Sequence, residues 1–170
     1  MYNPEDDSYL IEKYVRKLAR GKILDIGCGS GILMEAALTK SKDIFGVDID
    51  DESLEFCRKK GLNVKKSNLF ENVKEKFDFI IFNPPYLPED EIKDKDLVGG
   101  KKGYEIIKKF FSKAKKYLNE NGEILILFSS LTNKEKVDSI IRKNEFSYEK
   151  LEEKSVGLME RLYVYLCVSI

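Results

Sequence analysis

The chain has 170 residues, of which 42% are hydrophobic and 35% are charged, and its 30 basic side chains balance its 30 acidic ones. This length predicts a single domain covering residues 1–170, with one sizeable core. The zero net charge argues against a duplex-binding surface, which normally carries a basic excess. The chain contains no histidine, which excludes histidine-based acid–base catalysis. Its abundant lysine and glutamate are typical of thermophilic proteins.

The three cysteines, Cys28, Cys57 and Cys167, match no zinc-site spacing, and their odd number argues against a disulfide framework. We therefore expect no metal site, and we expect three small apolar thiols in a reducing cytoplasm. The acidic N-terminal segment does not resemble a signal peptide. No apolar run is long enough to span a membrane.

The predicted elements begin with an amphipathic helix and a strand that leads into a glycine-rich loop. Apolar residues recur at helical spacing over residues 10–18, and a strand is expected over residues 22–26. This strand runs into Gly27-Cys28-Gly29-Ser30-Gly31, which a helical pattern over residues 32–40 follows. Glycines let the backbone approach a ligand closely. The G-x-G-x-G spacing differs from dinucleotide and P-loop motifs, so alone it supports a cofactor site only weakly.

A second strand, expected over residues 43–48, ends in an acidic residue. Asp48 lies roughly 20 residues beyond the glycine loop, the offset at which a carboxylate binds ribose hydroxyls. The alternative is that Asp48 only caps the following helix, expected over residues 52–60. Asp50 or Asp51 is better placed for capping, which leaves Asp48 as the ribose candidate.

The third strand, expected over residues 62–67, is short and contains lysines, which predicts an edge of the sheet. Such an edge is able to accept a strand from a partner protein. Asn68 and Leu69 follow at its carboxyl end, level with the glycine loop and Asp48.

The motif Asn83-Pro84-Pro85-Tyr86 follows a buried strand expected over residues 77–82. The prolines end the sheet ladder at the carboxyl ends of the strands, where open α/β sheets bind ligands. The Asn83 side-chain carbonyl and the Pro84 backbone carbonyl are two acceptors that suit a planar –NH2 group. Holding both hydrogens would localise the nitrogen lone pair and aim it at an electrophile. The alternative is a proline-rich turn without a catalytic role.

The segment over residues 87–102 is a long polar loop, which predicts either a solvated loop or a substrate clamp.

The pattern of strands and helices predicts an α/β fold with a doubly wound, mostly parallel sheet and a reversed last strand. An amphipathic helix is expected directly after the loop at 87–102, and the lysines on the polar face of this helix are expected to be solvated. The remaining elements are expected as a helix at 103–120, a turn at 121–122, a strand at 123–128, a helix at 133–143, and strands at 146–156 and 162–168.

The glycine loop, Asp48 and Asn83-Pro84-Pro85-Tyr86 occur in this order on successive strand ends, and together they resemble class I S-adenosylmethionine-dependent methyltransferases. That resemblance implies a seven-stranded, Rossmann-like sheet. Residues 2–11, Tyr-Asn-Pro-Glu-Asp-Asp-Ser-Tyr-Leu-Ile, are similar to the opening of HemK-related glutamine methyltransferases. Residues 97–106 look like their Gly-Gly-x-x-Gly segment. Without a separate N-terminal helical domain, the chain looks more like the archaeal and eukaryotic branch than the bacterial one.

The family resemblance implies a reaction and two protein partners. The reaction is methyl transfer from S-adenosylmethionine to the side-chain amide nitrogen of the glutamine in the Gly-Gly-Gln motif of a class-1 translation termination (release) factor. The second partner is a small zinc-binding activator subunit in a heterodimer. Three alternatives stay open: the exocyclic nitrogen of adenine in RNA or DNA, a lysine side chain, and a non-catalytic methyltransferase-like binding subunit. Nucleic acid is the less favoured substrate, because the net charge is zero.

The resemblance also implies roles for individual residues. Asp25 and Gly27 are expected to line the cofactor methionine, and Asn68 stands where the family commonly has Asp. Asn83 and Pro84 are expected to hold the substrate nitrogen, with Tyr86 packed against the target group. The residues expected to contact the cofactor are Ser8, Asp25, Gly27, Gly29, Gly31, Asp48, Asn68, Leu69 and Asn83.

Overall fold

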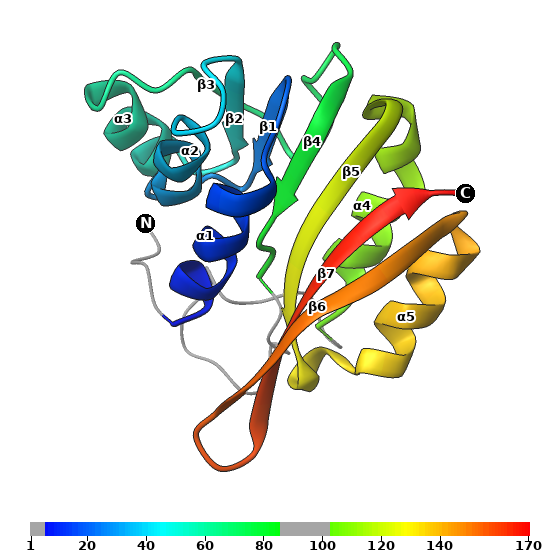
Figure 1. Ribbon diagram of the computed structural model, residues 1–170. Coiled ribbons are helices and arrows are strands. Elements are labelled where there is room, and N and C mark those ends of the chain that lie inside the picture. The colour runs from blue at the N-terminus through cyan, green and yellow to red at the C-terminus, as the bar shows by residue number, and fades with distance from the viewer. Residues whose placement is uncertain (1–5, 86–102) are drawn as a thin grey trace.

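The computed structural model of the protein describes residues 6–85 and 103–170, in which strands and helices alternate (Figure 1). Tyr86, the opening residues 2–5 and the loop at 87–102 with Gly99 and Gly100 lie outside the described residues. The helices are α1 (Asp6–Leu18), α2 (Ile32–Ala37), α3 (Asp51–Lys59), α4 (Glu105–Ala114) and α5 (Lys134–Lys143), with short 3-10 segments η3 (Lys115–Tyr117) and η4 (Ser130–Thr132). The strands are β1 (Ile23–Ile26), β2 (Ile44–Asp48), β3 (Val64–Lys66), β4 (Phe77–Phe82), β5 (Leu118–Ser129), β6 (Phe146–Val156) and β7 (Glu160–Ser169).

The described strands form one seven-stranded sheet in the order β3-β2-β1-β4-β5-β7-β6. The strands from β3 to β5 are parallel to one another, and β7 is antiparallel to both of its neighbours. This confirms the predicted doubly wound sheet with a reversed last strand. The short strand β3 lies at one edge of the sheet, as its lysines predicted.

Both faces of the sheet are covered, and the two cores follow from the alternation of side chains along each strand. On β4, Ile80 and Phe82 pack with α4 and α5, whereas Phe79 and Ile81 pack with α1 and α2. Figure 1 shows these two pairs of helices on opposite sides of the sheet. Because the central strands are buried on both faces, they read in sequence as continuous apolar runs.

The last third of the predicted helix at 103–120 was wrong. Helix α4 ends at Ala114, a 3-10 turn follows, and β5 already begins at Leu118. Leu118 pairs with Phe77 before the β4–β5 register shifts, so the expected turn at 121–122 is an irregularity inside the strand. Leu118 packs into the same core as α4, so its apolar side chain fits the helical pattern and the strand equally well. Helix α2 is also shorter than predicted, because it ends at Ala37 rather than at Lys40.

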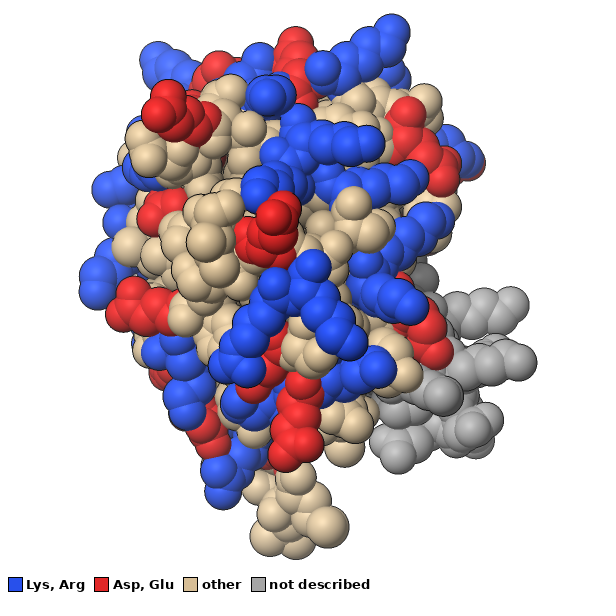
Figure 2. Space-filling view, turned by 90° about the vertical axis from the view of Figure 1, so that its right-hand side faces the viewer, with Lys and Arg blue, Asp and Glu red and all other residues tan. Residues whose placement is uncertain are grey.

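The outer surface of α4 and α5 is rich in basic side chains, which are interspersed with acidic ones (Figure 2). Lys108, Lys109 and Lys113 are exposed on α4, as predicted, while Phe110 and Phe111 on the opposite side are buried. None of the helices in the described part of the chain is long and apolar enough to cross a bilayer.

Candidate active site

The glycine loop after β1 forms one wall of a cavity. Its backbone is held against β2 because Gly27 N donates to Val47 O at 2.8 Å and Cys28 N donates to the same oxygen at 3.0 Å. Gly27 and Gly29 have φ angles of 74° and 49°, and a Cβ atom at either would meet no described atom within 4 Å. Gly31 plays a different role, because a Cβ atom there would lie 2.5 Å from Leu62 Cδ1. The first two glycines therefore leave open space at the loop, while the third lets α2 pack closely.

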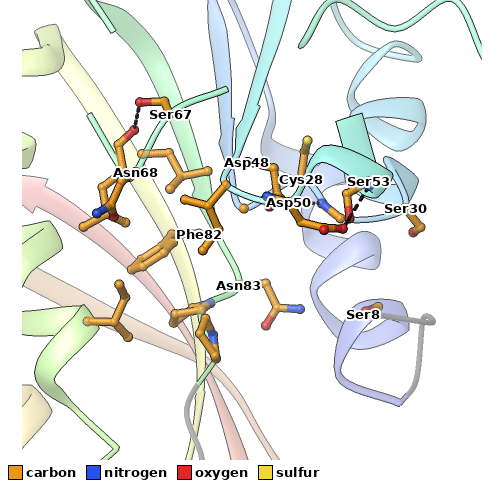
Figure 3. A pocket seen from close by; sticks show the side chains of 18 of the residues that line it. Ser8, Cys28, Ser30, Asp48, Asp50, Ser53, Ser67, Asn68, Phe82 and Asn83 are labelled. Atoms are coloured by element: carbon orange, nitrogen blue, oxygen red, sulfur yellow. Dashed lines mark hydrogen bonds between the residues drawn. The ribbon is translucent and has the colours of Figure 1, made fainter. Parts of the chain in front are cut away.

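Asp48, at the end of β2, ties the glycine loop to the start of α3 (Figure 3). Its Oδ2 accepts from Gly29 N at 2.8 Å, and its Oδ1 accepts from Asp50 N at 2.9 Å. Asp50 is the N-cap of α3, where its carboxylate accepts from Ser53 N and Ser53 Oγ. These bonds from Ser53 lower the pKa of Asp50. The predicted capping role of Asp50 is confirmed, and the ribose-binding role of Asp48 stays a prediction.

Asn83 follows β4, and its side-chain amide is oriented by a residue from α1. Its Nδ2 donates to Asp7 Oδ2 at 3.3 Å, while Asp7 Oδ1 accepts from Ser8 N at 2.7 Å. Asn83 Oδ1 is buried and has no hydrogen-bond partner among residues 6–85 and 103–170. Because the carboxylate of Asp7 is an acceptor at neutral pH, the amide nitrogen turns toward it. The amide oxygen is thereby left as an acceptor for another molecule.

These loops enclose a cavity of about 540 Å³, a volume typical of sites for small molecules. Of the predicted site residues, it is lined by Ser8, Gly27, Gly29, Asp48, Asn68, Leu69, Asn83 and Pro84. Gly31 and Asp25 do not line it. The structure thus brings together groups from α1, from the ends of β1, β2 and β4, and from the segment after β3.

The lining residues that sequence reasoning did not predict include Asp7, Cys28, Ile49 and Ile106. Cys28 and Ile49 are adjacent in sequence to predicted site residues, and this adjacency could have identified them as lining residues. Burial raises the pKa of the Cys28 thiol, which keeps it protonated and poorly nucleophilic. Ile106 comes from α4, on the other side of the sheet from α1, and no local pattern indicates that it reaches the cavity.

Asp25 on β1 is a buried carboxyl group without a partner. Its side chain is 1% exposed, and neither oxygen accepts a hydrogen bond within the described part of the chain. Burial raises the pKa of Asp25 to about 8, and the nearby charge of Asp48 contributes in the same direction. A carboxylate at this depth needs a cation or a proton. Among the described residues there is no cluster of His, Cys, Asp and Glu that could hold a metal ion.

The Asp25→Asn variant is expected to change the pH dependence of stability. Asp25 has a pKa of about 8 in the fold against an ordinary value of 3.8, so the folded state binds the extra proton between these values. The free energy of unfolding of the wild type therefore loses a contribution as pH rises from about 4 to about 8. Urea unfolding from pH 4 to pH 9 should show the variant gaining stability relative to the wild type up to about pH 8. Parallel pH profiles for the two proteins would contradict the assignment.

The cavity lies at the carboxyl edge of a doubly wound sheet, where proteins of this class of fold bind their ligands. The chain belongs to the methyltransferase small domain family, whose model matches residues 6–156. It is 37% identical over 162 residues to a Methanocaldococcus jannaschii protein named "Putative protein N5-glutamine methyltransferase", covering 88% of this chain and 82% of that one. This confirms the resemblance that the motifs indicated.

Two bacterial relatives are longer than this chain. A release factor glutamine methyltransferase of Borreliella burgdorferi is 36% identical over 161 residues, which cover 81% of this chain and 56% of the relative. The ribosomal RNA small subunit methyltransferase C of Buchnera aphidicola is 36% identical over 121 residues, which cover 66% of this chain and 33% of the relative. The chain thus spans about half of the first relative and a third of the second.

Solved structures share the fold. A chain of the E. cuniculi Mtq2–Trm112 complex, described as responsible for methylation of the termination factor eRF1, superposes with a TM-score of 0.83 at 22% identity, covering 99% of this chain and 98% of that one. A S-adenosylmethionine-dependent methyltransferase from Bacteroides fragilis, solved with S-adenosyl-L-homocysteine, gives a TM-score of 0.69 at 20% identity, covering 94% of this chain and 76% of that one. The predicted class I methyltransferase fold is confirmed.

Proposed function

We propose that this protein transfers a methyl group from S-adenosylmethionine to the side-chain amide nitrogen of the glutamine in the Gly-Gly-Gln motif of a translation termination factor. The observation that carries the proposal is the buried, unpartnered Oδ1 of Asn83 beside a cavity of about 540 Å³. The names of the archaeal and bacterial relatives support glutamine as the acceptor. Termination factors act in the cytoplasm, where we also place this protein.

The residues around the cavity fit S-adenosylmethionine. Asp25 does not line the cavity itself, but it precedes Gly27 by two residues, and its buried carboxyl group, which has no partner in the described chain, would gain one in the ammonium group of the cofactor. The open space at Gly27 and Gly29 would admit its methionine portion. Asp48 uses one acceptor site on each oxygen for the backbone, and the remaining lone pairs suit ribose hydroxyls. When bound, S-adenosylmethionine supplies an electrophilic methyl group.

Three other positions complete this assignment. Ser8, at the start of α1, would close over the cofactor, and Asn68 and Leu69 would flank its adenine ring. An asparagine oxygen at position 68 accepts from the adenine amino group without adding a negative charge. Leu69 is mostly buried and has a φ angle of 51°, so its backbone is held in an unusual conformation at the cavity wall.

The chain would act on its substrate mainly by orientation. Asn83 Oδ1 and the Pro84 carbonyl would accept the two hydrogens of the glutamine –NH2 group, with Tyr86 against the target side chain. This arrangement turns the nitrogen lone pair toward the methyl donor. Positive charge develops on the nitrogen during transfer, and the two oxygens stabilise it. No strong general base is required, because the nitrogen becomes acidic once it is alkylated.

The amino group of adenine is the alternative acceptor, because it presents the same planar pair of hydrogens to Asn83 and Pro84. The similarity of this chain to a relative named as a ribosomal RNA methyltransferase supports this alternative. The zero net charge of the chain argues against it, because RNA substrates are held largely through basic contacts to phosphates. A lysine acceptor fits less well, because its ammonium group is not planar.

We propose that a small zinc-binding activator subunit pairs with this chain along the free edge of β3. Within the described residues β3 pairs only with β2, and Lys65 and Lys66 are exposed. A strand from a partner would extend the sheet there. The shared fold with a chain of the Mtq2–Trm112 complex supports the idea of a heterodimer. The isolated chain is accordingly expected to be less soluble and less active than the pair.

The test of the proposed function is methyl transfer from labelled S-adenosylmethionine to three acceptors offered in parallel. These are a termination factor, the same factor with the glutamine of its Gly-Gly-Gln motif replaced, and structured RNA. The chain is assayed alone and with a zinc-binding partner. Label on the intact factor alone supports the proposal. Label on RNA would indicate adenine as the acceptor, and label on the altered factor would indicate lysine.

A further inference from the structure

The hairpin formed by the ends of β6 and β7 projects beyond the sheet on the edge that carries the cavity. We call residues 153–162 the hairpin arm. The β5–β7 ladder ends where Ser129 pairs with Leu162, and only β6 pairs with β7 beyond that point. Ser129 is the carboxyl end of β5, so the arm continues in the direction in which β4 leads to Asn83. Figure 1 shows the arm extending past the rest of the described chain.

The stem of the arm is braced on several sides. Arg161 N donates to Ser130 Oγ at 3.0 Å, and Ser129 Oγ donates to Glu160 Oε1 at 2.6 Å. Glu153 pairs with Arg161 across the hairpin at 2.6 Å, and with Lys150 along β6 at 2.7 Å. Exposed ion pairs contribute little individually to stability. Together with the contacts to η4, however, they fix the direction of the arm.

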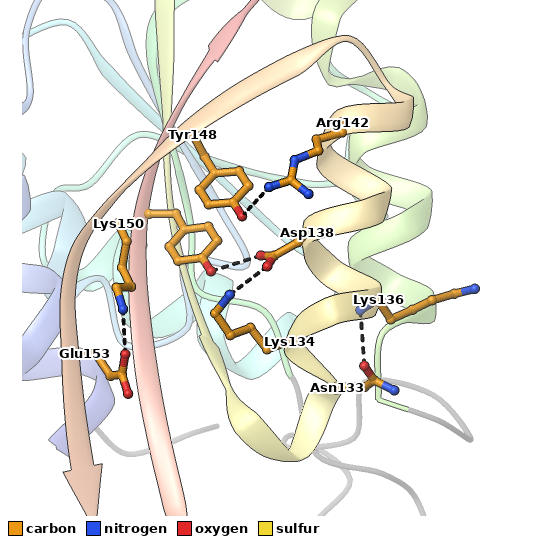
Figure 4. A network of polar contacts seen from close by, with 9 residues as sticks. Asn133, Lys134, Lys136, Asp138, Arg142, Tyr148, Lys150 and Glu153 are labelled. Carbon is orange, nitrogen blue, oxygen red and sulfur yellow. Dashed lines mark hydrogen bonds and ion pairs between the residues drawn. The ribbon is translucent and has the colours of Figure 1, made fainter.

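Both strands of the arm are also anchored at their base (Figure 4). The buried Tyr165 on β7 donates to Asp138 on α5 at 2.9 Å, and Asp138 pairs with Lys134 at 2.6 Å. On the other face of the sheet, Tyr14 of α1 donates to Glu152 of β6 at 2.6 Å. Two helices from opposite faces thus hold the strands from which the arm extends.

The end of this braced arm is apolar. Leu158 and Met159 are 103% and 92% exposed, and they follow Gly157 in the turn. Turns at such positions usually carry polar residues, glycine or proline. The lower end of the molecule in Figure 2 is correspondingly uncharged, below a zone of mixed charge. Single exposed apolar residues are ordinary on protein surfaces, but here two large neighbours occupy the end of a fixed projection.

The distance between the cavity and the end of the arm is too long for one small molecule to contact both, but a folded protein can do so. Strands β4 and β7 are separated by β5 alone, or about 10 Å at the usual strand spacing. From the register, Met159 lies about 20 Å beyond Phe82 along the strand direction. A folded domain of about 100 residues has a radius of gyration near 13 Å, so it is large enough to reach both places.

We propose that the hairpin arm is a docking element for the protein substrate, with Leu158 and Met159 packing on an apolar patch of the factor that is remote from the loop of the acceptor glutamine. This inference rests on the proposed function and adds a second contact, remote from the cavity, that selects a folded protein. A cavity alone would distinguish poorly between a glutamine and an adenine amino group. An apolar contact at the arm favours a protein surface over the charged backbone of a nucleic acid.

The experiment replaces both side chains in the variant Leu158→Ser/Met159→Ser and measures steady-state kinetics and direct binding with a termination factor, with the partner subunit present if activity requires it. We expect KM and Kd for the factor to rise at least about 10-fold, as when interface anchors are truncated. The kcat at saturating factor and the Kd for S-adenosylhomocysteine should stay unchanged. Because both side chains are fully exposed, the variant is expected to fold normally.

The matched control is Val168→Ser/Ile170→Ser, which removes two exposed apolar side chains at the opposite end of β7. Val168 is 39% exposed and pairs with Glu123, and Ile170 is 78% exposed. This control should leave KM and Kd for the factor unchanged. An unchanged Kd in the arm variant, or an equal rise in the control, would overturn the proposal. Loss of affinity for the zinc-binding partner, or of self-association, would reassign the arm to that contact.

These outcomes are separable from failure of the proposed function. A wild-type protein that binds the factor but methylates only RNA would refute glutamine methylation, and the arm could still be judged from binding. Methylation of the factor with identical kinetics for the wild type and the arm variant would refute the arm alone. Absence of both binding and methylation by the wild type would refute the two proposals together.

Discussion

Replacing Asn83 by alanine is expected to abolish methyl transfer while leaving cofactor affinity largely intact. The side-chain oxygen of Asn83 is a buried acceptor without a partner in the described chain. Its removal eliminates one of the two acceptors that are predicted to hold the substrate nitrogen. Loss of one preorganised group of this kind typically costs about 10²–10³ in kcat. We expect a loss of at least that size in labelled methyl transfer, with the Kd for S-adenosylhomocysteine changed only severalfold in calorimetry.

A matched control for this variant is Asn144→Ala at the end of α5. The two asparagines are both half-buried, and each side-chain nitrogen makes one hydrogen bond, Asn144 Nδ2 to Ile140 O at 2.8 Å. Asn144 does not line the cavity. The control should therefore lose some stability but retain kcat. Joint loss of methyl transfer and cofactor affinity in Asn83→Ala would show that the asparagine has a different role.

The sequence predicted those parts of the fold that depend on local pattern. The apolar run before Asn83 identified β4, and the lysines of the third strand identified an edge, because each signal belongs to a single element. The end of α4 was missed because Leu118 satisfies helical spacing and strand burial alike. Only the pairing of Leu118 with Phe77, far away in sequence, decides between the two.

The site shows the same limit. Strand ends predicted Asp48 and Asn83, because the carboxyl ends of parallel strands meet at one edge of the sheet. The contact between Asp7 and Asn83 joins residues 76 positions apart, and in the sequence Asp7 was only one residue of the N-terminal motif at 2–11. Its role depends on where the sheet places the start of α1. Asp25 was predicted as a cofactor residue, but its complete burial and missing partners emerged only from the fold.

Replacing Asp7 by alanine is expected to lower kcat by about 10- to 100-fold, because Asp7 holds Asn83 in its working orientation. The carboxylate accepts from Asn83 Nδ2 at 3.3 Å, and this bond directs Oδ1 away from Asp7. Without it, the amide can rotate and present its –NH2 group to the substrate nitrogen, which is also a donor. Asp7 is therefore a positioning residue. Its loss should affect kcat more than the KM for the termination factor.

The conservative variant Asp7→Asn separates orientation from a structural role. Its side-chain oxygen is still able to accept from Asn83, but its –NH2 group also permits the reversed arrangement, so activity should fall between wild type and Asp7→Ala. The side-chain amide resonances of Asn83, assigned in ¹⁵N-labelled protein by their absence from Asn83→Ala, report the hydrogen bond independently of activity. They should shift in both Asp7 variants. Unchanged resonances together with a low kcat would place the effect of Asp7 elsewhere, most directly in Ser8, whose backbone N–H it also accepts at 2.7 Å.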